Sequence, residues 1–149
     1  MLLGIDPLLS PELLMILRAM GHGDEIVITD ANFPAVSNAK RLVRLDGVGS
    51  SDALQAVLSV MPLDSFVESP ASGMQVVGKP DEIPPAIADF QSIIDRLAGF
   101  PVKIGRIERH AFYERARSCF AVVATTDRRL YANVILTKGV IGADGKVVA

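Results

Sequence analysis

The sequence contains a single cysteine, Cys119, among its 149 residues. One cysteine excludes an intramolecular disulfide and a metal cluster held by several thiolates. Cys119 opens the apolar run 119–123, so we expect a buried structural thiol and not a catalytic nucleophile. Only two histidines are present, which excludes a metal site rich in histidine.

Blocks of basic residues and long apolar runs are also absent. The formal net charge is −2, and nucleic-acid binding would require a basic stripe that the sequence does not show. No apolar run reaches the roughly 18 residues of a membrane span, and the apolar N-terminal segment lacks the basic flank of a signal peptide. We therefore expect a cytoplasmic protein with no nucleic-acid or membrane partner.

Several common motifs of catalysis and nucleotide binding are missing as well. The sequence has no G-x-G-x-x-G after a strand, no P-loop, no G-x-S-x-G and no H-E-x-x-H. Enzymes that depend on a dinucleotide, on a P-loop, on a nucleophile elbow or on that zinc motif are thereby disfavoured. Any chemistry has to come from a less common arrangement of residues.

Half of the residues are hydrophobic, which suits one substantial core in a chain of this length. Apolar periodicity and turn residues predict helices near 11–20, 51–61, 85–98 and 109–117, and strands near 25–29, 41–45, 64–68, 74–77, 103–107, 119–124 and 132–137. Their alternation predicts an α/β fold: a single three-layer α/β/α domain over residues 1–149, with a mixed, largely parallel sheet and a loose tail after about residue 140. The β-branched strand 25–29 should be central, whereas the strand order stays open.

The residues best suited to chemistry flank this central strand. His22 lies in a glycine turn before it, where a ligand can approach the backbone closely and an imidazole can exchange protons near neutral pH. Asp30 ends the strand, at the edge where α/β sheets usually bind ligands. A strand of five to six residues spans about 17–20 Å, so the two side chains cannot meet along it. Either the His22 loop folds back, or a neighbouring subunit supplies one of the pair.

Taken singly, these residues also have simpler interpretations. A histidine in a glycine turn is usually solvated, and an aspartate after a strand often only forms a turn. Arg109 would ordinarily be a surface charge, and Tyr131 and Asn133 share one face of a strand start. The charged cluster 127–129 is interpreted as a solvated hairpin loop.

An ordered set of motifs spans nearly the whole chain. Its pieces are residues 14–30, 33–35, 44–47, 51–52, 112–116, 131–136 and 138–140. Together they resemble the fucose mutarotase and ribose pyranase family, and its fucose branch more closely.

The resemblance implies that His22 is the catalytic acid/base. It also implies a set of sugar-binding residues, Asp30, Arg109, Tyr131, Ala132 and Asn133. Arginine at position 109 is typical of fucose-type members, whereas ribose-type members carry histidine there. Family members form rings, often decamers, with sites near subunit boundaries, so the resemblance implies a homo-oligomer.

The implied reaction exchanges the α and β anomers of a monosaccharide, for which the fucose branch points to L-fucose. Ring opening removes a proton from the anomeric hydroxyl and delivers one to the ring oxygen, so no cofactor or metal is expected. Pyranose/furanose exchange of ribose, a non-catalytic sugar-binding module and a purely structural oligomer remain alternatives. Two departures bear on the choice of sugar: His110 stands where an aromatic is expected, and residues 67–84 differ too much from the family pattern to be aligned residue by residue.

Overall fold

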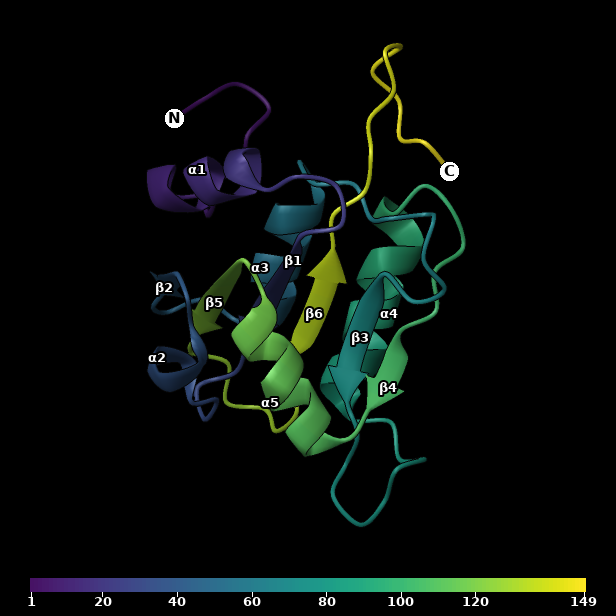
Figure 1. The fold of residues 1–149 in the computed structure, drawn as a ribbon. Coiled ribbons are helices and arrows are strands. Elements are labelled where there is room, and N and C mark those ends of the chain that lie inside the picture. The colour runs from purple at the N-terminus through teal and green to yellow at the C-terminus, as the bar shows by residue number, and fades with distance from the viewer.

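The computed structural model describes residues 1–149 and places a six-stranded sheet between two layers of helices (Figure 1). The strand order is β2-β5-β1-β6-β3-β4. The strands are β1 Glu25–Thr29, β2 Leu42–Leu45, β3 Ala71–Met74, β4 Gly105–Ile107, β5 Ala121–Thr125 and β6 Val134–Thr137. The pairings of β6 with β1 and β3 are antiparallel and the other three are parallel, which confirms the mixed, largely parallel sheet.

The helices are α1 Pro11–Ala19, α2 Ala35–Asn38, α3 Ser50–Leu58, α4 Pro85–Leu97 and α5 Arg109–Ser118. Helix α1 begins as predicted, because the Ser10 side chain accepts a hydrogen bond from the Leu13 amide at 3.2 Å and Pro11 occupies the first turn. The longest helix, α4, has 13 residues, and no helix here has the length and apolar character needed to cross a membrane.

The alternating side chains of the central strand β1 face two separate cores. Ile26 and Ile28 pack in a large cluster with α1, α3 and α4, whereas Val27 packs on the other face with Phe112 and Ala116 of α5. Burial of each such aliphatic side chain stabilises the fold by about 1.5–3 kcal/mol. The two cores, one on each side of the sheet, establish the three predicted layers.

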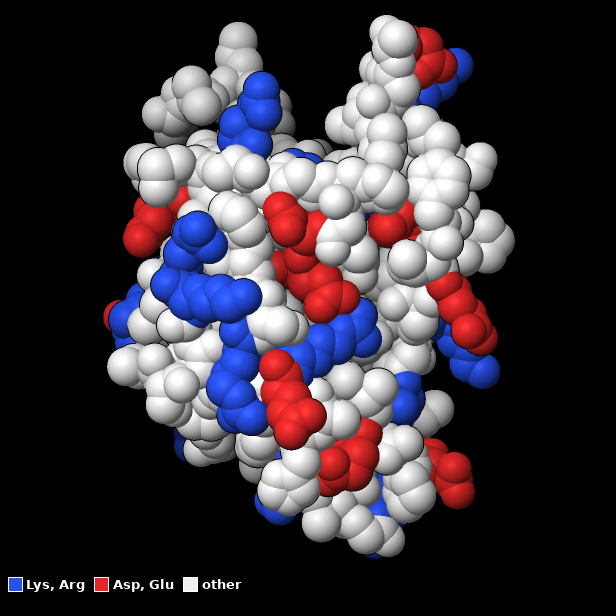
Figure 2. All heavy atoms as spheres, viewed as in Figure 1, with Lys and Arg blue, Asp and Glu red and all other residues white.

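The α5 layer is also held to the sheet by charge. The Arg115 guanidinium reaches the Glu25 carboxylate at the start of β1, with Nε 3.0 and 3.1 Å from its two oxygens. This pairing raises the pKa of Arg115, and Nη1 of the same side chain donates to Ser72 on β3 at 2.9 Å. Figure 2 shows basic and acidic side chains adjoining on this face of the molecule.

Two predicted strands are wrong in position. Residues 64–68 form no strand, and the strand predicted at 74–77 lies instead at Ala71–Met74. Three of the four residues of β3 are small and none is β-branched, so strand periodicity does not reveal this strand. At Gly73 a Cβ would lie 2.6 Å from Cδ1 of Ile87 on α4, so a larger residue there would displace the end of that side chain.

Candidate functional site

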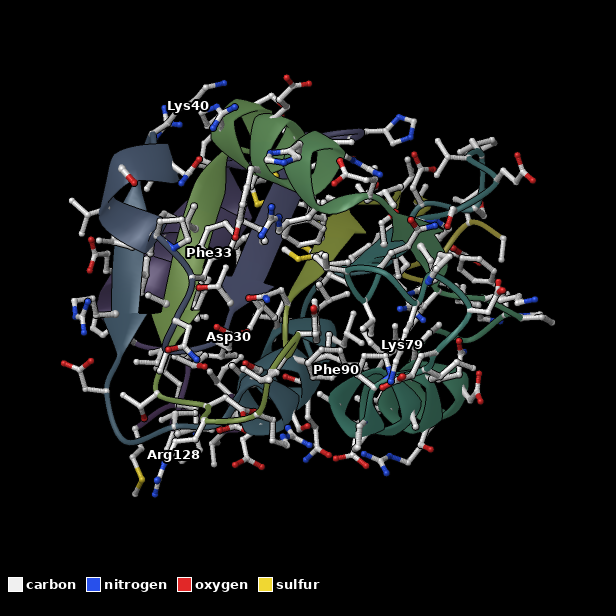
Figure 3. All side chains as sticks on the ribbon, turned by 90° about the horizontal axis from the view of Figure 1, so that it is seen from below. Asp30, Phe33, Lys40, Lys79, Phe90 and Arg128 are labelled. Carbon is white, nitrogen blue, oxygen red and sulfur yellow. The ribbon has the colours of Figure 1, made fainter.

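Asp30 closes β1 at the lower end of the sheet, which Figure 3 shows from below. Its side chain is buried and forms a reciprocal pair with Asn133. The Asn133 amide nitrogen donates to Asp30 Oδ2 at 2.8 Å, and the Asp30 backbone N–H donates to Asn133 Oδ1 at 2.8 Å. Burial raises the pKa of Asp30, although hydrogen bonds from Asn32 and Asn133 oppose the rise. The carboxylate is therefore fixed in orientation by two residues.

A cavity of about 200 Å³ opens beside this pair, lined by Asp30, Asn32, Phe33, Met74, Val77, Arg109, Tyr113, Leu130, Tyr131 and Asn133. The structure thus brings together four of the predicted sugar-binding residues, from β1, the start of α5 and the loop before β6. The fifth, Ala132, is fully buried in the main core. Its backbone N–H, and not its side chain, hydrogen-bonds to the Asp30 carboxylate and lowers the pKa of that group.

Arg109 stands at the first position of α5, where the Glu108 side chain caps the helix by accepting from the His110 amide at 2.7 Å. The Arg109 Nε atom is buried and has no hydrogen-bond partner. An unpaired buried donor costs about 1–3 kcal/mol, so an acceptor on a bound ligand would relieve it. His110 lies exposed beside it, with Nε2 3.4 Å from Arg109 Nη2.

Tyr131 has a backbone φ of +61°, which no other non-glycine residue of the chain shares. A left-handed conformation costs a residue with a Cβ about 1–2 kcal/mol, and such strain concentrates at ligand sites. The Tyr131 hydroxyl accepts a hydrogen bond from the Val77 amide at 3.2 Å. This contact joins the loop before β6 to the segment after β3, across the cavity.

His22 lies at the opposite end of β1, in the turn that follows α1 at the upper end of Figure 1. The chain between His22 and Asp30 runs through the extended strand, so the His22 loop does not fold back to the cavity. That alternative is wrong within one copy of the chain. His22 Nε2 lies instead 3.2 Å from Asp64 Oδ2, and the two side chains are 49% and 3% exposed.

Asp64 is a site residue that sequence reasoning missed. It lies 42 residues from His22, in a segment interpreted as a strand, and no motif marks it. Its second oxygen accepts from the Phe66 amide at 3.0 Å, and the Phe66 ring meets the imidazole edge-on with centroids 5.7 Å apart. The imidazole is thus held by a buried carboxylate while half of its surface stays open.

Lys138 fixes the turn that carries His22. Its ammonium donates to the carbonyls of Leu17 and Met20 at 2.7 and 2.6 Å, satisfying acceptors at the C-terminus of α1. Its backbone carbonyl accepts from the Gly23 amide at 2.9 Å. The turn is therefore tied to the end of β6 on both sides of His22.

The interpretation of residues 127–129 as a solvated hairpin loop is wrong. The loop joins β5 to β6, which are not neighbours in the sheet, and of the three residues only Arg128 is exposed. Asp127 is buried and accepts from the Ser50 amide at 3.0 Å, so it caps α3 from a distant loop. Arg129 Nη2 donates to Asp127 at 2.7 Å and to Ser51 at 2.9 Å. The Asp127 carbonyl accepts from the Ala31 amide at 2.9 Å, which ties this network to the loop after Asp30.

A metal site is not apparent in this arrangement. No group of three or more His, Cys, Asp or Glu side chains lies close enough to hold a metal ion. The cavity offers instead one carboxylate, two carboxamides, one guanidinium and two phenols, beside apolar side chains. Such a mixture suits a neutral ligand with several hydroxyl groups and an apolar part.

Known proteins match this chain over nearly its whole length. Residues 3–141 match the RbsD / FucU transport protein family. The chain is 49% identical over 144 residues to the fucose mutarotase of Homo sapiens, covering 93% of each chain. It is 44% identical to the fucose mutarotase of Streptococcus pneumoniae, solved in complex with L-fucose, with a TM-score of 0.88 over 95% of this chain and 100% of that one.

A more distant structure shares the fold alone. Bacillus subtilis RbsD, solved with D-ribose, is 22% identical, with a TM-score of 0.72 over 90% of this chain and 95% of that one. The family match spans nearly the whole chain, and the relatives named above are covered almost end to end. The chain therefore belongs to the RbsD/FucU family.

Proposed function

We propose that this protein is a mutarotase that interconverts the α and β anomers of L-fucose. The observation that carries the proposal is the cavity of about 200 Å³ in which Asp30, Asn133 and Arg109 meet. A buried acceptor and an unsatisfied buried donor there match the hydroxyl groups of a sugar. Phe33, Met74 and Leu130 supply an apolar wall, which suits the methyl group of a 6-deoxy sugar. The relatives that are fucose mutarotases support the same choice.

The reaction needs a group that takes a proton from the anomeric hydroxyl and returns one to the ring oxygen. His22 has this role in our proposal, because an imidazole can act as both acid and base near neutral pH. Positioned acid–base groups typically contribute about 10²–10⁴-fold. Asp64 holds the imidazole in one orientation, while Asp30, Arg109, Tyr131 and Asn133 orient the sugar.

The working site takes His22 from a second copy of the chain. Two features support this arrangement: His22 and the cavity lie at opposite ends of β1, and half of the His22 side chain is open. Several large apolar side chains at the His22 end are also exposed, among them Phe66 (67%), Leu3 (103%) and Ile141 (54%). We propose a homo-oligomeric ring of the decameric type, one domain per subunit, that acts in the cytoplasm.

Anomer exchange measured by NMR saturation transfer across a sugar panel tests the activity. L-fucose should exchange faster with enzyme than without it, and faster than D-ribose, D-galactose or L-rhamnose. If pyranose/furanose exchange of D-ribose is the reaction that the enzyme accelerates most, the protein is a pyranase instead. Sugar binding by calorimetry without any acceleration would identify a binding module and contradict the mutarotase proposal.

A further inference from the structure

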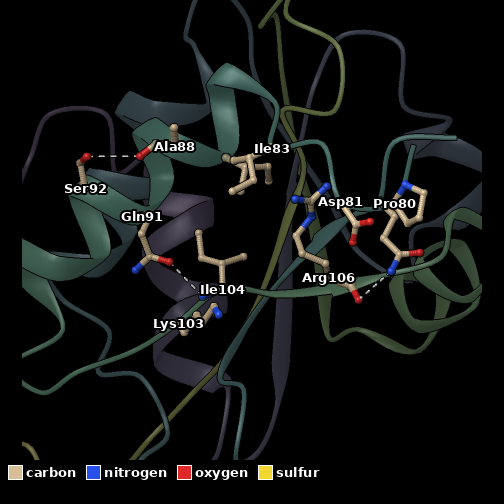
Figure 4. A pocket seen from close by; sticks show the side chains of 11 residues that line it. Pro80, Asp81, Ile83, Ala88, Gln91, Ser92, Lys103, Ile104 and Arg106 are labelled. Atoms are coloured by element: carbon tan, nitrogen blue, oxygen red, sulfur yellow. Dashed lines mark hydrogen bonds between the residues drawn. The ribbon is translucent and has the colours of Figure 1, made fainter. Parts of the chain in front are cut away.

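The segment of residues 75–82 after β3 separates two cavities. Val77 lines the cavity at Asp30. Gln75, Pro80 and Asp81 line a second cavity of about 540 Å³ between the segment, α4 and β4 (Figure 4). The segment is therefore a wall with one side toward the sugar-binding residues.

Two contacts hold this wall from its two sides. On the sugar side, the Tyr131 hydroxyl accepts from the Val77 amide at 3.2 Å. On the other side, Arg106 Nη2 donates to the carbonyls of Met74 and Glu82, both at 3.1 Å. Met74 immediately precedes the segment and Glu82 is its last residue, so one guanidinium joins both ends.

Arg106 forms no ion pair, although Asp81 lines the same cavity and the Glu82 carbonyl accepts a hydrogen bond from its guanidinium. Burial lowers the pKa of its guanidinium, which shows that the charge is partly removed from water without an ion pair to compensate. Figure 4 shows the side chain beside Pro80 and Asp81. Charged donors to backbone carbonyls are strong, directional contacts, and here they fix the geometry of a loop.

The segment has few other restraints. Turn hydrogen bonds join the Lys79 amide to Val76 at 3.0 Å and the Glu82 amide to Lys79 at 3.1 Å. The Lys79–Glu82 ion pair is exposed and contributes little. Val77, Gly78, Lys79 and Pro80 are all exposed. The Gln75 amide also donates to the Ile107 carbonyl at 2.8 Å and ties the first residue of the segment to β4. Without Arg106, the other end of the segment, at Glu82, would lose its hydrogen bond to β4, and the Tyr131 hydroxyl alone would hold Val77 at the cavity.

We propose that Arg106 is a positioning residue for sugar binding: it clasps both ends of the 75–82 segment and so holds Val77 and the Tyr131 hydroxyl at the cavity. The inference rests on the proposed function. Arg106 lies outside the lining of the cavity at Asp30, so in this proposal it acts on the sugar only through the segment. Its loss should therefore weaken sugar binding and leave the proton transfers of the bound sugar nearly unchanged.

The test compares Arg106→Gln, Arg106→Lys and the control Arg44→Gln, whose side chain is exposed and pairs only with Asp46. Steady-state anomer exchange of L-fucose gives KM and kcat, and hydrogen exchange of the intact protein reports the amides of Val77 and Lys79. For Arg106→Gln we expect KM to rise on the order of fivefold with kcat within about twofold, together with faster amide exchange. Arg106→Lys should fall between the wild type and Arg106→Gln, and the control should match the wild type.

Unchanged KM with unchanged amide exchange would overturn the proposal, and so would a fall in kcat at constant KM. Should Arg106→Gln fail to fold, the same two readouts on Arg106→Lys decide. A wild-type protein that leaves fucose exchange at its uncatalysed rate would contradict the proposed function. Even then, amide exchange would show separately whether Arg106 holds the segment.

Discussion

His22 is the residue on which the proposed chemistry depends, and Asp64 is the group that holds it. A partly exposed imidazole without a partner samples several rotamers and both neutral tautomers. The 3.2 Å contact from Nε2 to a carboxylate that is 3% exposed restricts both. The geometry matches the general arrangement in which a base is oriented by a third group.

Asp64→Asn should therefore lower kcat for fucose anomer exchange by roughly 10-fold or more, with little effect on KM. The amide keeps the shape of the carboxylate but does not stabilise an imidazolium. Asp46→Asn, an exposed position paired only with Arg44, is the control and should behave as the wild type. Full activity of Asp64→Asn would show that His22 acts without this carboxylate.

The buried carboxyl of Asp30 should make both fold stability and sugar affinity depend on pH. Because burial raises the pKa of this carboxyl, the folded protein holds the proton more tightly than the unfolded chain does. This carboxyl therefore lowers the stability of the fold as pH rises from its unfolded value, about 3.9, through its raised folded value. Sugar affinity has the opposite sign, because the ionised carboxylate is the better acceptor.

Fucose affinity should fall as pH drops through the raised pKa of Asp30. Calorimetric titrations of L-fucose at a series of pH values, with the Asp30 carboxyl followed by NMR, should give coinciding midpoints above the usual value. Asp30→Asn should bind more weakly and without this pH dependence. An affinity of the wild type that stays constant through the Asp30 titration would argue against a direct contact with sugar.

The candidate site residues named from the sequence are those next to strong local signals. His22 and Asp30 flank a β-branched strand, and Arg109, Tyr131 and Asn133 stand in matching motifs. Asp64 and Arg106 were not named, because their proposed roles rest on contacts over 42 residues with His22 and 32 residues with Met74. Local periodicity carries no information about such pairs.

Among the elements, α3 shows how a distant loop completes a helix. Its N-cap, Gly49, has no side chain to accept a hydrogen bond, and Asp127 supplies the carboxylate instead. Burial opposes ionisation of Asp127, but hydrogen bonds from Arg129 and the Ser50 amide outweigh it, so its pKa lies below the usual value. The stabilisation is therefore present above the unfolded pKa and is lost as pH falls through the folded pKa.

Asp127→Asn should lower the free energy of unfolding at pH 7 by about 1–2 kcal/mol. The difference from the wild type should shrink at pH values below about 4, where the native carboxylate also takes up a proton. Urea unfolding at pH 7 and at a pH below about 4 measures this difference. Arg128→Gln, at the exposed neighbouring position, should leave the free energy of unfolding unchanged at both pH values. An equal loss at both pH values would place the effect in packing and not in charge.

Elements bounded by clear capping or turn residues were predicted well. Helix α4 follows from Pro84-Pro85 and its apolar stripe, and β1 was predicted at its observed bounds, Glu25–Thr29. Strand β3 was misplaced because its residues, Ala71-Ser72-Gly73-Met74, have little intrinsic preference for strand. Its place in the sheet comes from pairing with β4 and β6, which the local sequence does not reveal.

For the whole molecule, the main consequence of the fold is that the two halves of the proposed chemistry lie apart. Asp30, with the other proposed sugar-binding residues, lies at the C-terminal end of β1 (Figure 3), and His22 lies in the turn before the N-terminal end of the same strand. The length of β1 made this separation predictable from sequence. The arrangement of copies that would bring the ends together is not encoded in any local pattern.

Activity in mixed oligomers of two inactive variants tests this most directly. His22→Ala and Asp30→Asn, each made alone, should fold and lose fucose exchange. When the two chains are co-expressed in equal amounts and assemble at random, about a quarter of sites combine an intact His22 with an intact cavity from its neighbour. NMR saturation transfer should then recover about a quarter of the wild-type rate. Mixed oligomers that stay inactive, or a His22→Ala variant with wild-type exchange, would contradict a site shared between copies.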